Sequence, residues 1–373
     1  RNYFEAQLIK NLKDQLNAFS PSSFEFVKKI SGAILVKLNK KGLENFKEIE
    51  NALTHTFGIV NYAFASSIEQ DLEKIKSFYW DLIKEKDFKT FRVTCQRSNK
   101  EFPMNSAEIE REIGGFIFEK FERKKAVKLK DPDCECFVAI INNYALVSLD
   151  KKKGPGGLPV GTGGRAMVLM SGGFDSPVAA FNILRRGVTT CFVHFHSIPY
   201  TSRASLEKVT DLIKVLKKYH SSGILYCVPF ADAQKEIVMK CPESLRVILY
   251  RRLMLKVAQE LAKREKSLAL VTGDSIGQVA SQTLENIFAV SQVCGMPIFR
   301  PLIGTDKEDI MDIAKKIGTY DISKLAHDDC CTRLMPKKPE LRAKLPKVLE
   351  AEKALDIPKM ISEILAGVEK IKI

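Results

Sequence analysis

The segment Ser-Gly-Gly-Phe-Asp-Ser, residues 171–176, has the residue types that point most directly to chemistry. It follows the apolar run AMVLM and precedes PVAAFNILRR, which predicts a strand, a tight turn and a helix. Such a turn presents backbone N–H groups at the positive end of a helix dipole, where phosphate binds readily. Gly172 and Gly173 let the backbone approach an anion, and Ser171 and Ser176 add hydroxyl donors. We therefore predict a phosphate site at this SGGFDS loop.

The loop lacks the Lys-Ser/Thr pair of a Walker loop. Without that lysine it is poorly suited to the transfer of a γ-phosphate, and it suits a pyrophosphate that departs. Asp175 would repel phosphate unless it binds Mg²⁺ or orients a reacting group, so we predict a catalytic or metal-linked role for it. A helix N-cap is the alternative. Asp274, which follows Gly273, is a second acidic candidate near the nucleotide.

Strands and amphipathic helices alternate from residue 166 onward. This order predicts a doubly wound parallel sheet, with its ligand at the carboxyl ends of the strands. The SGGFDS loop follows the first of these strands. The predicted strands are residues 166–170, 189–195, 223–230 and 268–273, and the predicted helices are 177–186, 203–218, 243–264 and 306–317.

The first part of the chain predicts two α+β units, one ending near residue 65 and the other near residue 153. Their expected elements are strands within 24–38, a helix at 42–56 and a strand at 58–65, then a helix at 68–84, a strand at 88–96, a helix at 106–123 and strands at 134–142 and 144–150. Residues 154–164 contain six glycines and two prolines, which predicts a linker or surface loop. A phosphate cradle is the alternative there, but no G-x-x-x-x-G-K-[ST] pattern supports it.

Length and charge limit the class of protein. A chain of 373 residues is expected to form two or three domains. Its net charge of +14 favours a polyanionic partner, and the excess is uneven: residues 1–150 hold 24 basic and 22 acidic side chains, and the rest hold 35 and 23. The absence of a long apolar run predicts no membrane association, and nine irregularly spaced cysteines favour a reducing, cytoplasmic location.

The SGGFDS loop resembles the motif of the ATP pyrophosphatases, or PP-loop enzymes, which adenylate a carbonyl oxygen. Further segments narrow the resemblance to the tRNA 4-thiouridine synthetases, which also serve thiamine biosynthesis: HFHSIPYTS, RRLM, TGDSIGQVASQT, RPLIGTDKEDI and DDCCT. The resemblance spans the chain. It implies a ferredoxin-like domain at 1–65, a THUMP RNA-binding domain at 66–153, a linker at 154–165 and a PP-loop catalytic domain at 166–373.

The same resemblance implies the residues that contact ATP. Beyond the loop itself these are Leu169, Met170, His194, Phe195, Arg251, Gly273 and Gln282. Phe195 could offer an apolar face to the base and Arg251 a fixed charge for phosphate. For His194, a satisfied strand-end histidine is the alternative.

Thiolation of a uridine also needs a sulfur nucleophile, such as a cysteine persulfide. Cys330 and Cys331 stand in a polar segment, and the resemblance assigns sulfur handling to Cys331. Arg333 could lower its pKa, whereas Asp328 and Asp329 would oppose that. Many relatives carry a rhodanese-like domain after this point, and the sequence ends at Ile373 without one. We therefore expect sulfur from a separate carrier, a cysteine desulfurase or a rhodanese-like protein. The alternative is that Cys331 works with another thiol of this chain.

The stretch FKTFRVTCQRSNKEF interleaves aromatic residues with Lys89, Arg92, Arg97 and Lys100, as a surface that touches phosphates and unstacked bases would. We expect it to dock the 3′ end of tRNA, so that the uridine at position eight reaches the catalytic domain. The resemblance further implies a homodimer. Two alternatives are an amidating PP-loop enzyme acting on a small acid and a non-catalytic RNA-binding protein.

Overall fold

The computed structural model describes residues 2–30, 32–141, 144–149, 151–200, 202–325, 336 and 338–373. The chain divides into two compact units. The first comprises Arg1–Asn11, His55–Phe57 and Gly157–Ile373, and the second comprises Leu12–Thr54 and Gly58–Gly156. Among the described residues, no helix is long and apolar enough to cross a membrane.

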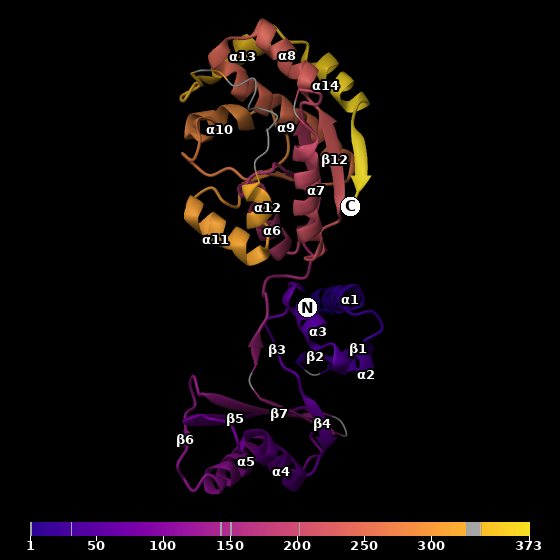
Figure 1. The fold of residues 1–373 in the computed structure, drawn as a ribbon, viewed down its shortest axis with the longest axis vertical. Helices are drawn as coiled ribbons and strands as arrows, with labels where there is room; N and C mark the ends of the chain where they lie inside the picture. Colours follow the sequence, from indigo (N-terminus) through magenta and orange to yellow (C-terminus); the bar gives the residue numbers. More distant parts are fainter. Residues whose placement is uncertain are drawn as a thin grey trace. The chain divides into compact units, whose positions relative to one another are not determined.

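The first unit is built on a six-stranded sheet in the order β14-β13-β10-β11-β12-β15 (Figure 1). Its strands are β10 (Arg165–Leu169), β11 (Thr189–His196), β12 (Ile224–Pro229), β13 (Ala269–Val271), β14 (Ile298–Phe299) and β15 (Glu369–Lys372). All neighbours pair in parallel except β15, which is antiparallel to β12. The predicted fold class, a mixed α/β chain with a doubly wound parallel sheet, is confirmed.

The order of these strands creates a crevice at the middle of the sheet. The chain runs from β10 through β11 to β12 and then returns to the other side of β10 to form β13. Connections that leave two adjacent parallel strands in opposite directions open a ligand site at their carboxyl ends. The SGGFDS loop follows β10 and the segment from Thr272 follows β13, so both lie at this crevice.

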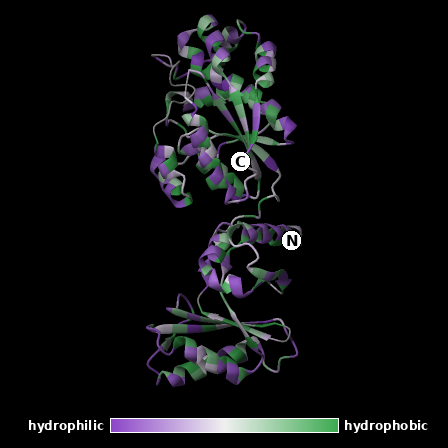
Figure 2. Ribbon diagram, turned by 45° about the vertical axis from the view of Figure 1, so that its right-hand side comes forward, coloured by the Kyte–Doolittle hydropathy of each residue, from purple (hydrophilic) through white to green (hydrophobic). Residues whose placement is uncertain are grey.

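Helices cover both faces of the sheet. Successive strand residues point to opposite faces, and Met167 and Val168 accordingly enter different apolar cores. Figure 2 shows the apolar strands enclosed by helices with mixed surfaces. One core includes residues of α6 (Asp175–Arg185), α7 (Ala204–Lys217), α11 (Lys307–Ile317) and α12 (Tyr320–Lys324), and the other includes residues of α8 (Ala231–Lys240), α9 (Arg246–Arg264), α10 (Leu284–Ser291), α13 (Leu345–Glu352) and α14 (Ile357–Ala366).

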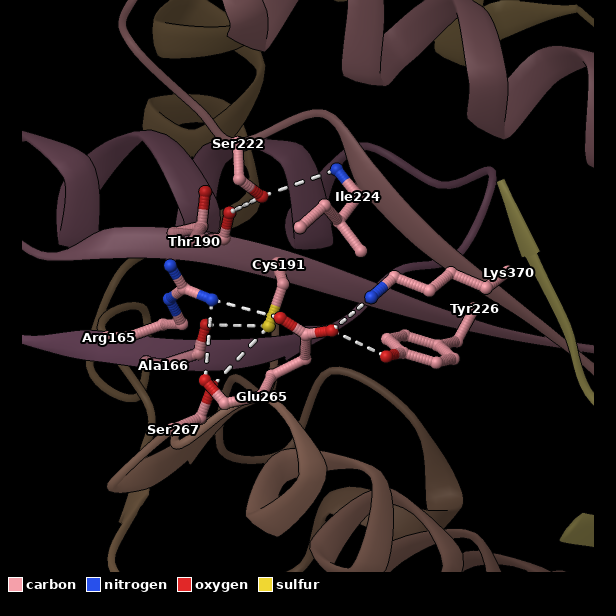
Figure 3. Close-up of polar contacts among 10 residues, drawn as sticks. All are labelled: Arg165, Ala166, Thr190, Cys191, Ser222, Ile224, Tyr226, Glu265, Ser267 and Lys370. Atoms are coloured by element: carbon pink, nitrogen blue, oxygen red, sulfur yellow. Dashed lines mark hydrogen bonds and ion pairs between the residues drawn. The ribbon is translucent and has the colours of Figure 1, made fainter. Parts of the chain in front are cut away.

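The last strand is fastened by a buried carboxylate, Glu265, which follows α9 (Figure 3). Its Oε1 accepts hydrogen bonds from Lys370 Nζ at 2.6 Å and Tyr226 Oη at 2.5 Å, and its Oε2 lies 2.9 Å from Arg165 Nη1. The hydrogen bond from Lys370, then that from Tyr226, hold the pKa of Glu265 below its usual range. Arg165 begins β10, so this network lies at the end of the sheet opposite the SGGFDS loop.

The second unit contains a five-stranded sheet in the order β4-β8-β7-β5-β6. Two helices pack on it through a shared apolar core. Ser66–Glu69 pairs with Tyr144–Leu149, and Thr90–Arg97 lies parallel to Cys134–Ile141. The elements are β4 (Ser66–Glu69), β5 (Thr90–Arg97), β6 (Ala126–Val127), β7 (Cys134–Ile141), β8 (Tyr144–Leu149), α4 (Leu72–Ile83) and α5 (Ser106–Lys120).

The smaller elements differ most from expectation. The helix predicted at 42–56 is two helices, because Asn45 ends the first of them outside the helical region at φ −114°. The strand predicted at 58–65 is reduced to two residues, and the helix predicted from residue 68 begins after Asp71, whose side chain caps it. A helix over residues 2–19 was not predicted. The helices and strands of residues 2–62, together with β9, are α1 (Asn2–Phe19), β1 (Phe24–Ile30), β2 (Ala33–Leu38), α2 (Lys40–Glu44), α3 (Phe46–Thr54), β3 (Asn61–Tyr62) and β9 (Lys152–Lys153).

The glycine-rich segment is an extensively bonded loop. Gly154 N donates to Val60 O, whereas Leu158 N donates to Arg185 O and Gly161 N to Gly187 O. The division between the two compact units falls within this segment, between Gly156 and Gly157. Our domain boundaries at residues 65, 153 and 165 stay predictions.

Candidate functional site

The SGGFDS loop is closed by its two serines. Ser176 Oγ accepts a hydrogen bond from Ser171 N at 2.9 Å and donates to Ser171 O at 3.1 Å. Phe174 is the N-cap of α6 and makes no side-chain capping bond, and Asp175 is the first residue of the helix. The first N–H groups of a helix have no acceptor within it, so the closed loop presents a compact array of donors at the crevice.

Asp175 is partly buried and points to the neighbouring loop. Its Oδ2 accepts a hydrogen bond from Gln278 Nε2 at 2.9 Å. Burial raises the pKa of Asp175, and Asp274 raises it further, whereas the bond from Gln278 and the charge of Lys307 lower it. Asp175 is the first residue of α6 rather than its N-cap, and its carboxylate lies between the two crevice loops.

Gly273 brings the two crevice loops together. A Cβ at this position would lie 2.8 Å from Ser176 N and 2.9 Å from the carbonyl carbon of Asp175. Real Cβ atoms do not approach backbone so closely, and backbone atoms cannot move aside at low cost. Gly273 is thus required for the packing of the β13 loop against the start of α6.

Asp274 is engaged by arginines and does not face a ligand freely. Its Oδ1 pairs with Arg251 Nη2, and its Oδ2 lies 3.1 Å from Arg300 Nε and 2.8 Å from Thr272 Oγ1. Burial alone would raise the pKa of Asp274, but Arg251, Thr272 and Arg300 together keep it below its usual range. This cluster borders a small cavity that is lined by Leu169, Arg251, Met254, Leu255, Thr272, Asp274, Val290 and Arg300.

The predicted nucleotide contacts fall into two groups. Leu169 and Arg251 line the cavity, and Gln282 lies beside it, with Nε2 3.4 Å from Asp274 Oδ1 and a buried Oε1 that has no hydrogen-bond partner. The side chains of the second group are occupied within the fold. His194 Nδ1 donates to Met170 O at 2.9 Å, and Phe195 packs against Phe230 in an apolar core.

Sequence reasoning missed four side chains of the site: Gln278, Thr272, Arg300 and Lys307. Thr272 and Gln278 lie within the TGDSIGQVASQT segment, and Arg300 and Lys307 within RPLIGTDKEDI. Both segments support the resemblance to the family, but the sequence alone assigns no role to these four residues. Polar side chains that follow β13 and β14 were the signal that could have identified them.

Three family profiles match the chain. The profile of the thiamine biosynthesis protein (ThiI) family covers residues 161–357, that of the THUMP domain covers 65–150, and that of the ThiI ferredoxin-like domain covers 1–63. The chain belongs to the ThiI family. A probable tRNA sulfurtransferase of Caldanaerobacter subterraneus is 45% identical to it over 361 residues, which are 97% of this chain and 93% of the relative.

Further relatives agree with this assignment. A probable tRNA sulfurtransferase of Thermus thermophilus is 43% identical over 86% of this chain and 78% of its own length. Among solved structures, a 4-thiouridine synthetase in complex with RNA and ATP has a TM-score of 0.86 and 33% identity, and the similarity covers 99% of this chain and 95% of that one. The resemblance predicted from the sequence is confirmed.

The predicted RNA-binding residues of this ThiI-family chain lie on and near β5. Lys89 and Lys100 are exposed. The two arginines make contacts within the unit: Arg92 Nη1 donates to Leu129 O, and Arg97 Nη1 donates to Phe102 O and Met104 O. Their contribution to RNA binding stays a prediction.

A second basic surface of the same unit was not singled out from the sequence. We call it the basic edge, and it surrounds β6, the edge strand of the sheet. The run KFERKKAVKLK is its signal. Exposed apolar side chains accompany the charges, with Val127 57% and Leu129 70% exposed. The exposed basic residues are Arg123, Lys124, Lys128 and Lys130.

The seven cysteines that the structure describes are poor nucleophiles. Five are buried and two are partly buried. Burial raises the pKa of Cys95 and Cys191 to about 11 and that of Cys227 to about 12, and it raises those of Cys241 and Cys294 as well. Thiols with such pKa values are mostly protonated near neutral pH. Cys330, Cys331 and their charged neighbours Asp328, Asp329 and Arg333 lie outside the described residues.

Proposed function

We propose that this protein is an ATP-dependent tRNA sulfurtransferase that converts the uridine at position eight to 4-thiouridine. The observation that carries the proposal is the lysine-free SGGFDS loop at the switch point of the sheet, in a chain whose solved relative is a 4-thiouridine synthetase with RNA and ATP. ATP is the activating substrate, and tRNA is the acceptor of sulfur.

The first step is the adenylation of uridine O4. O4 attacks the α-phosphorus of ATP, the O4–P bond forms, and the bond between the α-phosphorus and the bridging oxygen breaks as pyrophosphate leaves. The N–H groups at the start of α6 and the hydroxyl of Ser171 would stabilise the charge on the phosphates, and Ser176 would keep the loop closed around them. Lys307 could add a positive charge there, because it already acts on Asp175.

The second step replaces oxygen by sulfur. The terminal sulfur of a cysteine persulfide attacks C4, the C4–O4 bond breaks, and AMP departs. The remaining S–S bond to the donor is then cleaved by a second thiol, which leaves a disulfide for an external thiol reductant to reopen. We assign Cys331 as the persulfide carrier or as that second thiol, and a separate cysteine desulfurase or rhodanese-like protein as the sulfur source.

Mg²⁺ would accompany the nucleotide. Within the described parts of the chain, no group of three or more His, Cys, Asp and Glu side chains could hold a metal ion. Mg²⁺ commonly binds through one or two carboxylates together with substrate phosphates. Asp175 is the carboxylate we expect to fulfil this role, because both oxygens of Asp274 are already engaged. The ion would neutralise phosphate charge.

The remaining parts of the proposal concern the cell. We propose that the protein acts in the cytoplasm as a homodimer, where tRNA is available and thiols stay reduced. The sulfur it handles would also serve the synthesis of the thiamine thiazole, in keeping with the name of the family profile.

The deciding experiment is the product analysis of Mg·ATP with unmodified tRNA. We expect AMP and pyrophosphate to form only in the presence of tRNA, and 4-thiouridine to appear when a persulfide donor is added. ADP and phosphate as products would contradict the assignment. Ammonia-dependent amidation of a small acid would favour the amidating alternative, and tRNA binding without nucleotide turnover would favour a binding protein.

Cys331→Ser should abolish 4-thiouridine formation with a protein persulfide donor while ATP and tRNA binding persist. Cys330→Ser is the matched control and should keep much of the activity, because the side chains of adjacent residues point in different directions. High concentrations of free sulfide should partly restore the Cys331 variant, since sulfide can attack the adenylated uridine directly. Normal turnover of Cys331→Ser with the protein donor would refute the role of this thiol.

A further inference from the structure

The short helix α12 packs directly against the SGGFDS loop. Ser323 Oγ donates a hydrogen bond of 3.2 Å to Gly173 O, and the ring of Tyr320 lies 5.3 Å from that of Phe174, measured between centroids. Ser323 is 6% exposed, and the bond to Gly173 is partly buried. A helix that lies some 150 residues further along the chain therefore contacts the main chain of the candidate phosphate site.

The far end of α12 is held by a buried lysine of α7. Lys208 is 5% exposed, and its Nζ donates to Ser323 O at 2.8 Å and to Leu325 O at 2.6 Å. A buried ammonium needs such partners, and the carbonyls at the end of a helix carry partial negative charge. Lys208 thus fixes the backbone of the residue whose hydroxyl reaches Gly173. Helices α7 and α12 lie side by side in Figure 1.

The bond to Gly173 determines the direction of an N–H group. In a trans peptide the carbonyl and the following N–H point in opposite directions. Because Gly173 O points toward Ser323, the N–H of Phe174 points away from α12. Phe174 is the N-cap of α6, and its N–H is one of the donors available to an anion. A glycine peptide would otherwise rotate easily.

We infer that Ser323 and Lys208 are positioning residues for the phosphate-binding main chain of the SGGFDS loop. Ser323 holds the peptide between Gly173 and Phe174 in the orientation that donates to the nucleotide phosphates, and Lys208 holds Ser323. Neither side chain touches ATP. The inference rests on the proposed binding of ATP at this loop.

The test measures the affinity of the full-length protein for a non-hydrolysable ATP analogue with Mg²⁺ by calorimetry. Ser323→Ala should weaken binding about fivefold, as expected for the loss of the effect of one hydrogen bond. Ser323→Thr keeps a hydroxyl and should bind within about twofold of the wild type. Thr210→Val is the matched control, because within the described parts of the chain the Thr210 hydroxyl bonds to Leu206 O of its own helix alone.

A second measurement separates positioning from folding. In tRNA-dependent pyrophosphate release, Ser323→Ala should raise the KM for ATP about fivefold, while the KM for tRNA and the unfolding temperature remain close to those of Thr210→Val. Lys208→Met should weaken binding of the analogue at least as much as Ser323→Ala. Unchanged affinity of Ser323→Ala, or a loss that merely follows a lower unfolding temperature, would overturn the inference.

The outcomes for the proposed function are distinct. If the wild type binds the analogue but releases no pyrophosphate, the proposed reaction fails and the calorimetric comparison still decides the role of Ser323. If the wild type does not bind the analogue at all, the inference is overturned together with the assignment of the loop.

Discussion

Asp175 combines a position that favours chemistry with a cost to the folded state. Its carboxylate is partly buried, and burial raises its pKa. An acid whose pKa is raised by folding destabilises the folded protein at pH values above that pKa, and the effect disappears as the pH falls through it. A cation bound beside Asp175 would relieve this cost, which is consistent with a role in holding Mg·ATP.

Asp175→Asn should therefore abolish thiolation and yet not lower stability. The amide keeps the size of the side chain and can still bond to Gln278, while the buried charge is lost. We expect an unfolding temperature equal to or higher than that of the wild type at pH 8, with the difference vanishing near pH 3, where aspartic acid is largely protonated in both the folded and the unfolded chain. Calorimetric unfolding at the two pH values, with tRNA affinity measured in parallel, tests this. A lower unfolding temperature at pH 8, or lost tRNA binding, would indicate a structural role instead.

Residue types alone located the loop but not every role within the site. The glycines, serines and acid of SGGFDS predicted its place after a strand, and β10 and α6 have that arrangement. Phe195 looked suited to stack on a base, but it packs in the core, because a strand buried on both faces leaves few apolar side chains for a ligand. The arginine pair around Asp274 comes from α9 and from the residue after β14, which are distant from Asp274 in the sequence, so no local pattern could reveal it.

At the scale of elements, the long and strongly patterned segments were predictable and the short ones were not. The helix at 306–317 matches α11 within one residue, since Asp306 precedes an amphipathic run and Gly318 ends it in the left-handed region at φ 82°. β15 has the sequence EKIK and carries little apolar signal. It forms because its backbone pairs with β12, and tertiary contacts such as that of Lys370 with Glu265 hold it there.

Glu265→Gln should loosen this edge of the sheet. The substitution removes a buried negative charge that accepts from Arg165, Lys370 and Tyr226, and the two cations are partly exposed. We therefore expect the free energy of unfolding to fall by about 1–3 kcal/mol. Because the pKa of Glu265 is lowered by folding, its stabilisation is complete above the pKa of an unfolded glutamate and is lost as the pH falls through the folded value. The difference between variant and wild type should accordingly shrink in acid.

Urea unfolding at pH 7 and at pH 3.5 measures that difference. Glu260→Gln is the control, since Glu260 forms an exposed pair with Lys263 one turn away on α9. Equal stability of the two variants at pH 7 would show that the network around Glu265 contributes little.

At the scale of the whole molecule, the distribution of charged residues agrees only in part with an RNA-binding role for the THUMP-containing unit. The surplus of basic residues lies mainly after residue 150, yet the THUMP-containing unit carries a concentrated basic edge within a nearly balanced segment. A total over many residues conceals such local clusters, which is why composition predicted a polyanionic partner but not where it binds. The salt dependence of tRNA binding reports the number of phosphate contacts more directly than the composition does.

Neutralising Lys128 and Lys130 to Gln in the full-length protein should weaken tRNA binding and reduce the slope of log K against log salt by about 1 to 2, depending on how many phosphates these lysines contact. The control removes equal charge through Lys74 of α4 and its C-cap Lys84, which already pair with acidic neighbours. Titrations at several salt concentrations distinguish the two variants. Identical slopes for them would exclude the basic edge from the RNA interface.

The antiparallel strand β15 also affects how the protein is made. β12 ends at Pro229, and its outer edge is covered only by residues 369–372, so about 140 residues must be synthesised before that edge is paired. At the usual rate of translation this takes about ten seconds or more. During that interval an unpaired strand edge is open to other nascent chains on the same message. We expect the yield of soluble protein to depend on ribosome-associated chaperones more strongly than the stability of the finished fold would suggest.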